Sequence, residues 1–332
     1  LYIPIQLKTV ASIIQIVLPG MNMMAAMLIG VTVAVLYTSF SGMKGASAVG
    51  RVVCIGIYIL LIIFTVTTLS GFGGLGGLFE QLPENYNSMG NMPTQRIIAW
   101  ILGGCISTAV MQAVLQPLLA AKSPQAARTG SILGYLIAAP ICFFTAICGM
   151  LSKASGADLG DGSTAFAYAI KTFSSPVFAG IIFAFATMII AATMATMMLA
   201  TGTIITNIYK TEIDRNAGDQ KVLKISKSVT FIFAYLTLIP AFLIPSQSLT
   251  NLFLTLQHVA AAPVSFSILA GLMWKRCTKQ GAFWSMLTGM IVGISWMLLG
   301  LTDKMEAVYP VVVVTYSVGI IVSLMTSKKE IV

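Results

Sequence analysis

Charged side chains are scarce in this chain of 332 residues, since they make up 9% of it and only ten are acidic. An ordinary soluble domain is about 25% charged, so the composition excludes a soluble globular protein. Apolar residues take the place of the charges and account for 57% of the chain. The lipid bilayer is therefore the expected surrounding of this protein.

The apolar residues fall into long runs separated by short polar stretches. A membrane-spanning helix needs about 20 mostly apolar residues, and ten runs approach or exceed that length. They cover residues 3–20, 25–42, 50–70, 96–118, 129–151, 179–208, 226–245, 250–274, 281–301 and 308–325. The pattern predicts an all-α integral membrane protein with about ten transmembrane helices.

Basic residues are distributed unevenly between the two sides of the predicted helices. If successive loops alternate in side, one side carries fourteen Lys and Arg and the other carries four. Cytoplasmic loops are enriched in Lys and Arg, so we expect a multi-pass protein of the cell membrane with both ends of this chain in the cytoplasm. The fourteen are Lys44, Arg51, Lys122, Arg128, Lys210, Arg215, Lys221, Lys224, Lys227, Lys275, Arg276, Lys279, Lys328 and Lys329, and the four are Arg96, Lys153, Lys171 and Lys304. The remaining one, Lys8, lies inside the first run, and we expect its side chain to extend to the interface.

Several kinds of function lack the residues that they need. No acid lies inside an apolar run, the five cysteines show no metal-like pairing, and a single histidine leaves no nucleophile with an evident base. We expect no enzyme, no bound cofactor and no buried carboxylate to relay protons. The net charge of +9 is scattered over short loops, which argues against nucleic acid as a partner. The glycine cluster at residues 71–77 follows a membrane helix rather than a strand, so it is not expected to bind a nucleotide.

A few polar side chains inside the apolar runs are candidates for a function. His258 is the only histidine, lies next to Gln257 and precedes the helix-distorting Pro263. An intramembrane ionisable group is a functional candidate by default, so His258 could contact a solute or a proton, and the alternative is a packing role near the interface. Thr193 and Thr196 share one face of the predicted helix 179–208, where hydroxyls could bind a cation or could bond back to their own helix.

Five segments resemble, in the same order, the sodium/solute symporter family. The most specific is QPLLAAKSPQAARTGSILG at residues 116–134, which is similar to the family's stretch at the cytoplasmic end of its sixth core helix. The others are YTSFSGMKGASAV, GGLGGLFEQLP, ATGTIITNIYK and GLMWKRCTKQGAFWSMLTGMIVG. Together these matches extend over nearly the whole chain.

The resemblance implies a transporter fold of two five-helix repeats with inverted topology, in which the first helix of each repeat is broken. Residue 1 would fall near the third core helix, so we expect that earlier helices are absent from this chain. Residues 1–332 would form a single transmembrane transporter domain. Within it, residues 1–70 would be the remainder of the first repeat, 96–274 the second repeat, and 281–325 two additional helices.

Carrying the family's pattern over residue by residue gives a mixed picture. Gln112 and Gln116 keep polar positions of the sixth core helix and are the expected solute contacts, with His258 as a further candidate. The family's paired hydroxyl residues at its sodium site read Ala191 and Ala192 here, and the Asp that opens its fifth core helix reads Gly50. An alanine methyl group cannot coordinate Na⁺, so Thr193 and Thr196 become the candidate cation ligands.

These observations predict a secondary active transporter of a small polar or organic solute that works by alternating access. Its coupling ion could be Na⁺, H⁺ or none. Two alternatives remain open, a transporter-like sensory module and an uncoupled solute facilitator. The solute and the oligomeric state cannot be derived from the sequence.

Overall fold

The computed structural model describes the backbone over residues 2–86, 90, 92–159, 162, 164–243 and 249–327, and the side chains of the same residues except 39–48, 85, 113, 249–252 and 303. Within these ranges every regular element is a helix, so the predicted all-α class is confirmed. Lys328, Lys329 and the side chain of Lys44, which contribute to the predicted charge asymmetry, lie outside the described residues.

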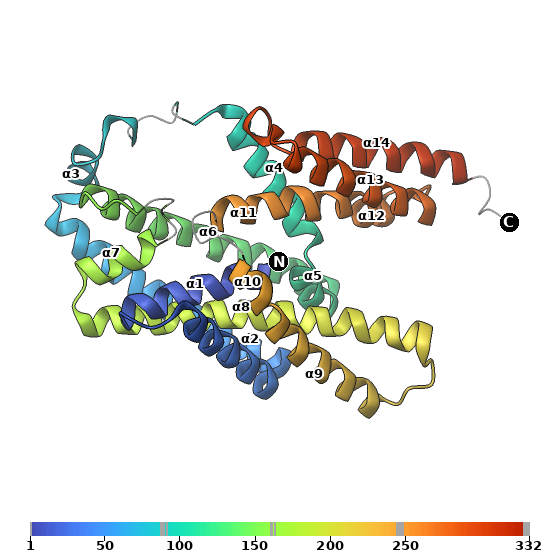
Figure 1. Ribbon diagram of the computed structural model, residues 1–332, viewed down its shortest axis with the longest axis horizontal. Helices are drawn as coiled ribbons and strands as arrows, with labels where there is room; N and C mark the ends of the chain where they lie inside the picture. Colours follow the sequence, from blue (N-terminus) through green and yellow to red (C-terminus); the bar gives the residue numbers. More distant parts are fainter. Residues whose placement is uncertain are drawn as a thin grey trace. The chain divides into compact units, whose positions relative to one another are not determined.

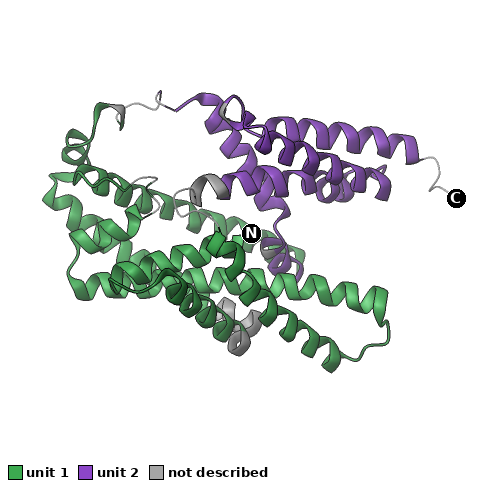
Figure 2. Ribbon diagram, in the orientation of Figure 1, with its two compact units in different colours: residues 1–87, 121–249 green, residues 88–120, 250–332 purple. Residues whose placement is uncertain are grey.

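The contacts of the chain divide it into two compact units (Figure 2). Unit 1 comprises Leu1–Asn87 and Ala121–Leu249, and unit 2 comprises Ser88–Ala120 and Thr250–Val332. These bounds differ from those of the two predicted repeats, which concern topology rather than contacts. The repeat structure therefore stays a prediction.

Unit 1 is built around the long helix α8, which packs against α1, α2 and α9 (Figure 1). Two apolar clusters hold it together, one centred on Phe64 and Ile182 and the other on Met27 and Met194. Its elements are α1 (Tyr2–Val17), α2 (Met23–Gly71), α3 (Gly74–Glu80), η1 (Glu84–Tyr86), α6 (Pro124–Ala154), α7 (Ala165–Phe173), α8 (Pro176–Ile208), the π-helical turn η3 (Tyr209–Ile213), α9 (Asp219–Leu236) and α10 (Leu238–Leu243).

Unit 2 contains a closely packed pair of helices, α13 and α14, with α12 against both. Small residues allow this approach, since a Cβ atom added to Gly289 of α13 would lie 2.2 Å from the Thr315 hydroxyl of α14. The elements of unit 2 are α4 (Thr94–Val110), α5 (Gln112–Leu119), α11 (Leu249–Leu256), the π-helical turn η5 (Gln257–Ala261), α12 (Ala262–Met273), α13 (Lys279–Leu298), η6 (Leu301–Asp303) and α14 (Val308–Thr326).

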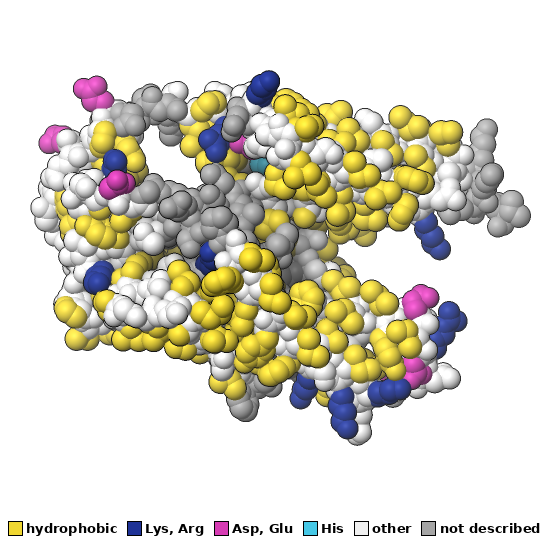
Figure 3. Space-filling model, in the orientation of Figure 1, with side chains coloured by type: hydrophobic (Ala, Val, Ile, Leu, Met, Phe, Trp, Pro, Cys, Tyr) yellow, Lys and Arg dark blue, Asp and Glu magenta, His cyan; other side chains and the backbone are white. Residues whose placement is uncertain are grey.

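Seven helices of the described chain are long and apolar enough to cross a membrane. Two shorter apolar helices, Tyr2–Val17 and Met23–Thr38, coincide with predicted spans. In Figure 3, hydrophobic side chains are widespread on the visible surface of both units, and charged side chains are few. The protein is therefore a multi-pass membrane protein, while the predicted number of ten helices stays a prediction.

Two local predictions are wrong. The segment that the predicted runs 25–42 and 50–70 leave between them is helical, because α2 runs from Met23 to Gly71 without a proline to interrupt it. Lys8 does not extend to a surface, because it is only 4% exposed on a face of α1 that packs inside unit 1. The run 96–118 contains a break, since α4 ends at Val110 and α5 begins at Gln112.

Candidate functional site

The interruption between α4 and α5 is the first feature that can hold a solute. Met111 has extended backbone angles (φ −66°, ψ 122°), and its N–H still donates to the Ser107 carbonyl of α4. A helix that stops and restarts frees backbone N–H and C=O groups from the helical ladder. Within a membrane such backbone is tolerated only where it is buried in protein or lines a cavity. The resemblance implied a break in this helix, and the structure contains one.

Gln112 and Gln116 follow this interruption directly. Gln112 is the first residue of α5, and Gln116 lies one helical turn later on the same face. Both side chains are half-buried. The two amides therefore form a polar edge beside freed backbone groups, in a chain whose other helices are mostly apolar.

His258 lies in the π-helical turn η5, between α11 and α12. Pro263, the second residue of α12, has no N–H to donate and crowds the preceding turn, which accounts for the wider turn just before it. The imidazole is buried, with a side chain 2% exposed. It packs against the backbone of α4, because a Cβ atom added to Gly103 would lie 2.6 Å from both Nε2 and Cδ2 of the ring.

Glu306, just before α14, connects His258 to α4. One carboxylate oxygen, Oε2, lies 3.6 Å from His258 Nδ1, and the other, Oε1, lies 3.2 Å from Arg96 Nε. The Arg96 guanidinium also lies 5.4 Å from the centre of the Trp100 ring, at cation–π distance. We call Arg96, His258 and Glu306 the charged cluster of unit 2.

Glu306 lies in a loop, as the sequence predicts, but its side chain is more sheltered than that of a typical loop acid, at 12% exposed. Burial raises the pKa of this carboxyl group above its ordinary value, and the nearby Arg96 cation offsets part of the rise. Its partners are distant in sequence, so no local pattern could have shown that this loop acid is sheltered.

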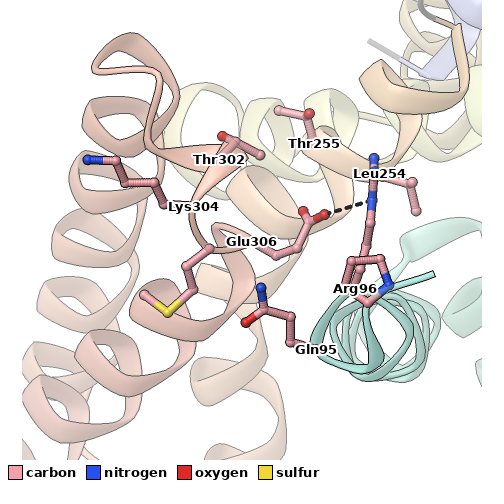
Figure 4. A pocket seen from close by; sticks show the side chains of 9 residues that line it. Gln95, Arg96, Leu254, Thr255, Thr302, Lys304 and Glu306 are labelled. Atoms are coloured by element: carbon pink, nitrogen blue, oxygen red, sulfur yellow. Dashed lines mark ion pairs between the residues drawn. The ribbon is translucent and has the colours of Figure 1, made fainter. Parts of the chain in front are cut away.

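A cavity of about 370 Å³ opens beside the charged cluster. In Figure 4 the Glu306 carboxylate points toward Arg96, the Gln95 amide points toward Glu306, and the Lys304 side chain extends away from the pair. The volume falls in the range of small-molecule sites, about 300–1,000 Å³. The lining residues are Pro93, Gln95, Arg96, Leu254, Thr255, Thr302, Lys304, Met305 and Glu306. This polar cavity gives solvent access to a carboxylate that is otherwise covered.

The candidate cation ligands lie in unit 1, on α8. Thr193 donates its hydroxyl proton to the Ile189 carbonyl at 2.9 Å, and Thr196 donates to the Thr193 carbonyl at 2.8 Å. Both hydroxyls therefore bond back to their own helix, as the alternative interpretation expected. A hydroxyl that donates its proton still has lone pairs that a cation can accept, so this geometry leaves a cation role open.

Three positions at which this chain lacks the polar residue of the family, Ala191, Ala192 and Gly50, have no side-chain oxygen to offer a cation. Ala191 is 3% exposed and belongs to the apolar cluster around Met194, whereas Ala192 is half-buried. A Cβ atom added to Gly50 would meet nothing within 4 Å.

The predicted residues are divided between the two units, with the glutamines and His258 in unit 2 and the threonines in unit 1. Gln112 and Gln116 share α5, Thr193 and Thr196 share α8, and the residues that contact His258 lie on α4 and just before α14. Arg96 and Glu306 are the functional candidates that the sequence did not single out. Glu306 is one of only ten acids and lies directly before a membrane helix, which makes it unusual in this chain but does not show that it is sheltered.

Comparison with known proteins identifies the family of this chain. The chain matches the family model of the sodium:solute symporter family over residues 1–289. The protein belongs to this family. The recognition from five collinear segments is confirmed, and the family's members are transporters rather than enzymes.

Individual relatives are distant. The chain is 24% identical to the high-affinity proline transporter PutP of Bacillus subtilis (strain 168), over 88% of this chain and 63% of that protein. It is 22% identical to sodium/glucose cotransporter 4 of Mus musculus, over 84% and 47%, and 23% identical to the sodium/pantothenate symporter of Escherichia coli (strain K12), over 80% and 56%. The chain therefore spans about half to two thirds of the length of these relatives.

Proposed function

We propose that this protein is a secondary active transporter that carries a small polar or organic solute across the cell membrane by alternating access. The observation that carries the proposal is the interruption of α4–α5 at Met111, with Gln112 and Gln116 directly after it. Secondary transporters bind their solute at helices broken near the middle of the bilayer, where freed backbone groups and a few polar side chains supply hydrogen bonds.

The roles of the other candidates follow from their chemistry. The amides of Gln112 and Gln116 can each donate and accept, which suits a polar solute better than a simple ion. The hydroxyl oxygens of Thr193 and Thr196 are the candidate ligands of a coupling cation. His258 is a further solute or proton contact. In this proposal both ends of the chain face the cytoplasm, and the five-plus-five inverted repeat supplies the alternating access.

Uptake into liposomes by the full-length protein tests the proposal. The solutes named for the relatives, proline, glucose and pantothenate, are a reasonable first panel, each offered under a Na⁺ gradient, an H⁺ gradient and neither. We expect saturable uptake of at least one solute that either gradient stimulates. Uptake that ignores both gradients would identify a facilitator, and absence of uptake across a broad panel would contradict transport.

Matched variants connect the uptake to the site. Gln112→Ala and Gln116→Ala should each raise the KM by about tenfold, because a lost hydrogen bond to a desolvated solute leaves its partner unpaired. Gln125→Ala, at an exposed position of α6, is the control and should leave uptake unchanged. If Thr196 is a cation ligand, Thr196→Val should weaken the dependence on the driving ion more than the affinity for solute.

A further inference from the structure

We infer that His258 and Glu306 together form a proton-binding site at the end of unit 2 that is predicted to face outward. The inference deepens the proposed function, on which it rests for its role in transport, because it supplies a driving ion at a defined place. It starts from an unusual feature of the buried imidazole, which has different surroundings at its two nitrogens.

The first nitrogen, Nδ1, faces the Glu306 carboxylate at 3.6 Å. This is slightly longer than a hydrogen bond, and two bare acceptors at this separation would repel each other. A neutral imidazole is therefore best accommodated with its proton on Nδ1, directed at Glu306. The carboxylate then fixes the tautomer and the orientation of the ring.

The second nitrogen, Nε2, is buried and makes no hydrogen bond of normal geometry within the described part of the chain. It faces α4 at Gly103, and the backbone of Ala99, one turn earlier on α4, is a partner of the ring. Since Nδ1 faces Glu306, we assign the Ala99 carbonyl to Nε2. With the proton on Nδ1, this nitrogen is an acceptor that faces another acceptor. A proton added to Nε2 turns it into a donor that the Ala99 carbonyl can accept, so proton uptake satisfies a group that is otherwise unpaired.

The charges around the pair limit the electrostatic cost of adding a proton. With Arg96 positive, Glu306 negative and His258 neutral, the charged cluster has no net charge, and one added proton brings it to +1. The proton comes from water in the adjoining cavity and can reach the pair through Glu306, whose carboxylate lies in the cavity wall. Among the described side chains, further charged or titratable groups in this region include Lys304, in the same wall, and Tyr309 of α14, whose hydroxyl donates to the Gln95 carbonyl.

Proton binding has a structural consequence because the pair joins separate elements. His258 belongs to the π-helical turn η5, its Nε2 faces α4, and Glu306 precedes α14. A proton on Nε2 adds a hydrogen bond between η5 and α4, and strengthens the attraction between η5 and Glu306. Since α4 ends at the interruption at Met111, directly before Gln112, occupancy of the proton site would affect the helix that leads into the candidate solute contacts.

Nitrogen NMR of the full-length protein, ¹⁵N-labelled at histidine, tests the inference without any transport assay. This chain has one histidine, and His258→Gln identifies its two ring signals. We expect the Nε2 signal to change from that of a bare nitrogen to that of a protonated one within about pH 3 to 8, where carboxyl and imidazole groups titrate. In Glu306→Gln the midpoint should move to lower pH by about one unit or more, because a nearby anion favours the imidazolium.

Glu84→Gln is the matched control, since Glu84 is an exposed acid of unit 1, and it should leave the midpoint unchanged. A His258 signal that does not change over this range in folded protein, or a midpoint that Glu306→Gln does not move, overturns the proton site. The two proposals fail separately. Titration without uptake of any solute contradicts transport alone, whereas uptake without titration contradicts the proton site alone.

Discussion

The ion pair Asp214–Lys221 of unit 1 and the ion pair Arg96–Glu306 of unit 2 differ in almost every respect. In unit 1, Asp214 and Lys221 approach to 2.9 Å across the short turn between η3 and α9, with side chains 32% and 58% exposed. In unit 2, Arg96 and Glu306 are 3.2 Å apart, join segments far apart in sequence, and shelter Glu306 to 12% exposure. The shorter pair, Asp214–Lys221, is expected to contribute less to stability. Exposure and sequence separation, rather than distance, decide what an ion pair contributes.

The same contrast extends to the uncharged polar groups. The hydroxyls of Thr193 and Thr196 in unit 1 are satisfied within α8 itself. The polar side chains of the charged cluster in unit 2 instead reach between elements, and His258 Nε2 is left without a normal hydrogen bond. A hydroxyl that donates within its own helix keeps one protonation state near neutral pH, whereas the imidazole and the carboxylate of the charged cluster can each gain or lose a proton.

Of the substitutions that test this comparison, removal of the Glu306 carboxylate should destabilise the protein most. Glu306→Ala leaves the Arg96 guanidinium and the His258 ring without their shared acceptor. Breaking a fully buried pair costs about 3–5 kcal/mol, and the 45% exposure of Arg96 reduces our expectation to about 1–3 kcal/mol. Thermal unfolding in detergent measures the loss. The exposed Glu84→Ala should not change the melting temperature, and equal effects of the two variants would contradict the structural role of the cluster.

A single methyl group at Gly103 should have the next largest effect. The new Cβ atom of Gly103→Ala would lie 2.6 Å from the His258 ring, so the buried imidazole must shift. Overpacking of this kind costs about 1–3 kcal/mol. Gly104→Ala is the control on the same helix, because its Cβ would meet nothing within 4 Å and alanine favours a helix by about 0.5–1 kcal/mol. If the two variants melt alike, the packing of His258 against α4 is incorrect.

The pH dependence of stability should distinguish Glu306 from an ordinary acid. Burial raises its pKa in the folded protein, so its contribution is fully present below the unfolded value of about 4.3 and is lost as pH rises through the folded pKa. Glu306→Gln cannot ionise and should therefore gain stability relative to the wild type as pH rises through that window. Melting curves of both proteins at matched pH values measure the difference. A difference that stays constant, or that falls with pH, contradicts the raised pKa.

Much of the fold could be predicted from the sequence because membrane helices are determined by local composition. The apolar runs and the family resemblance predict the all-α membrane class, and Pro263 predicts a helix distortion, which the structure shows as the π-helical turn η5. The break at Met111 has no local sign, since no glycine or proline lies beside it, and only the resemblance implied it. The succession of apolar runs could not show that α2 continues as a helix beyond Thr38.

The candidate site was predictable where function depends on one residue and not where it depends on pairing. His258 was identified because a lone intramembrane histidine is rare in such a chain. For its partner Glu306, in a loop, the sequence predicts a solvated acid, because sequence position carries no information on which distant residues cover it. The face shared by Thr193 and Thr196 followed from helical spacing, but the direction of each hydroxyl required coordinates.

The smallest effect is expected at the surface pair of unit 1. The hydrogen bond from Lys221 lowers the pKa of Asp214, so this pair adds stability above the unfolded value of about 3.9 and the contribution is lost as pH falls through the folded pKa. Salt screens such an exposed pair. Asp214→Asn should therefore lower the melting temperature slightly at low salt and neutral pH, and not measurably at high salt. A loss as large as that of Glu306→Ala, and independent of salt, would remove the contrast between the two units, because a short exposed contact would then stabilise as much as a sheltered one.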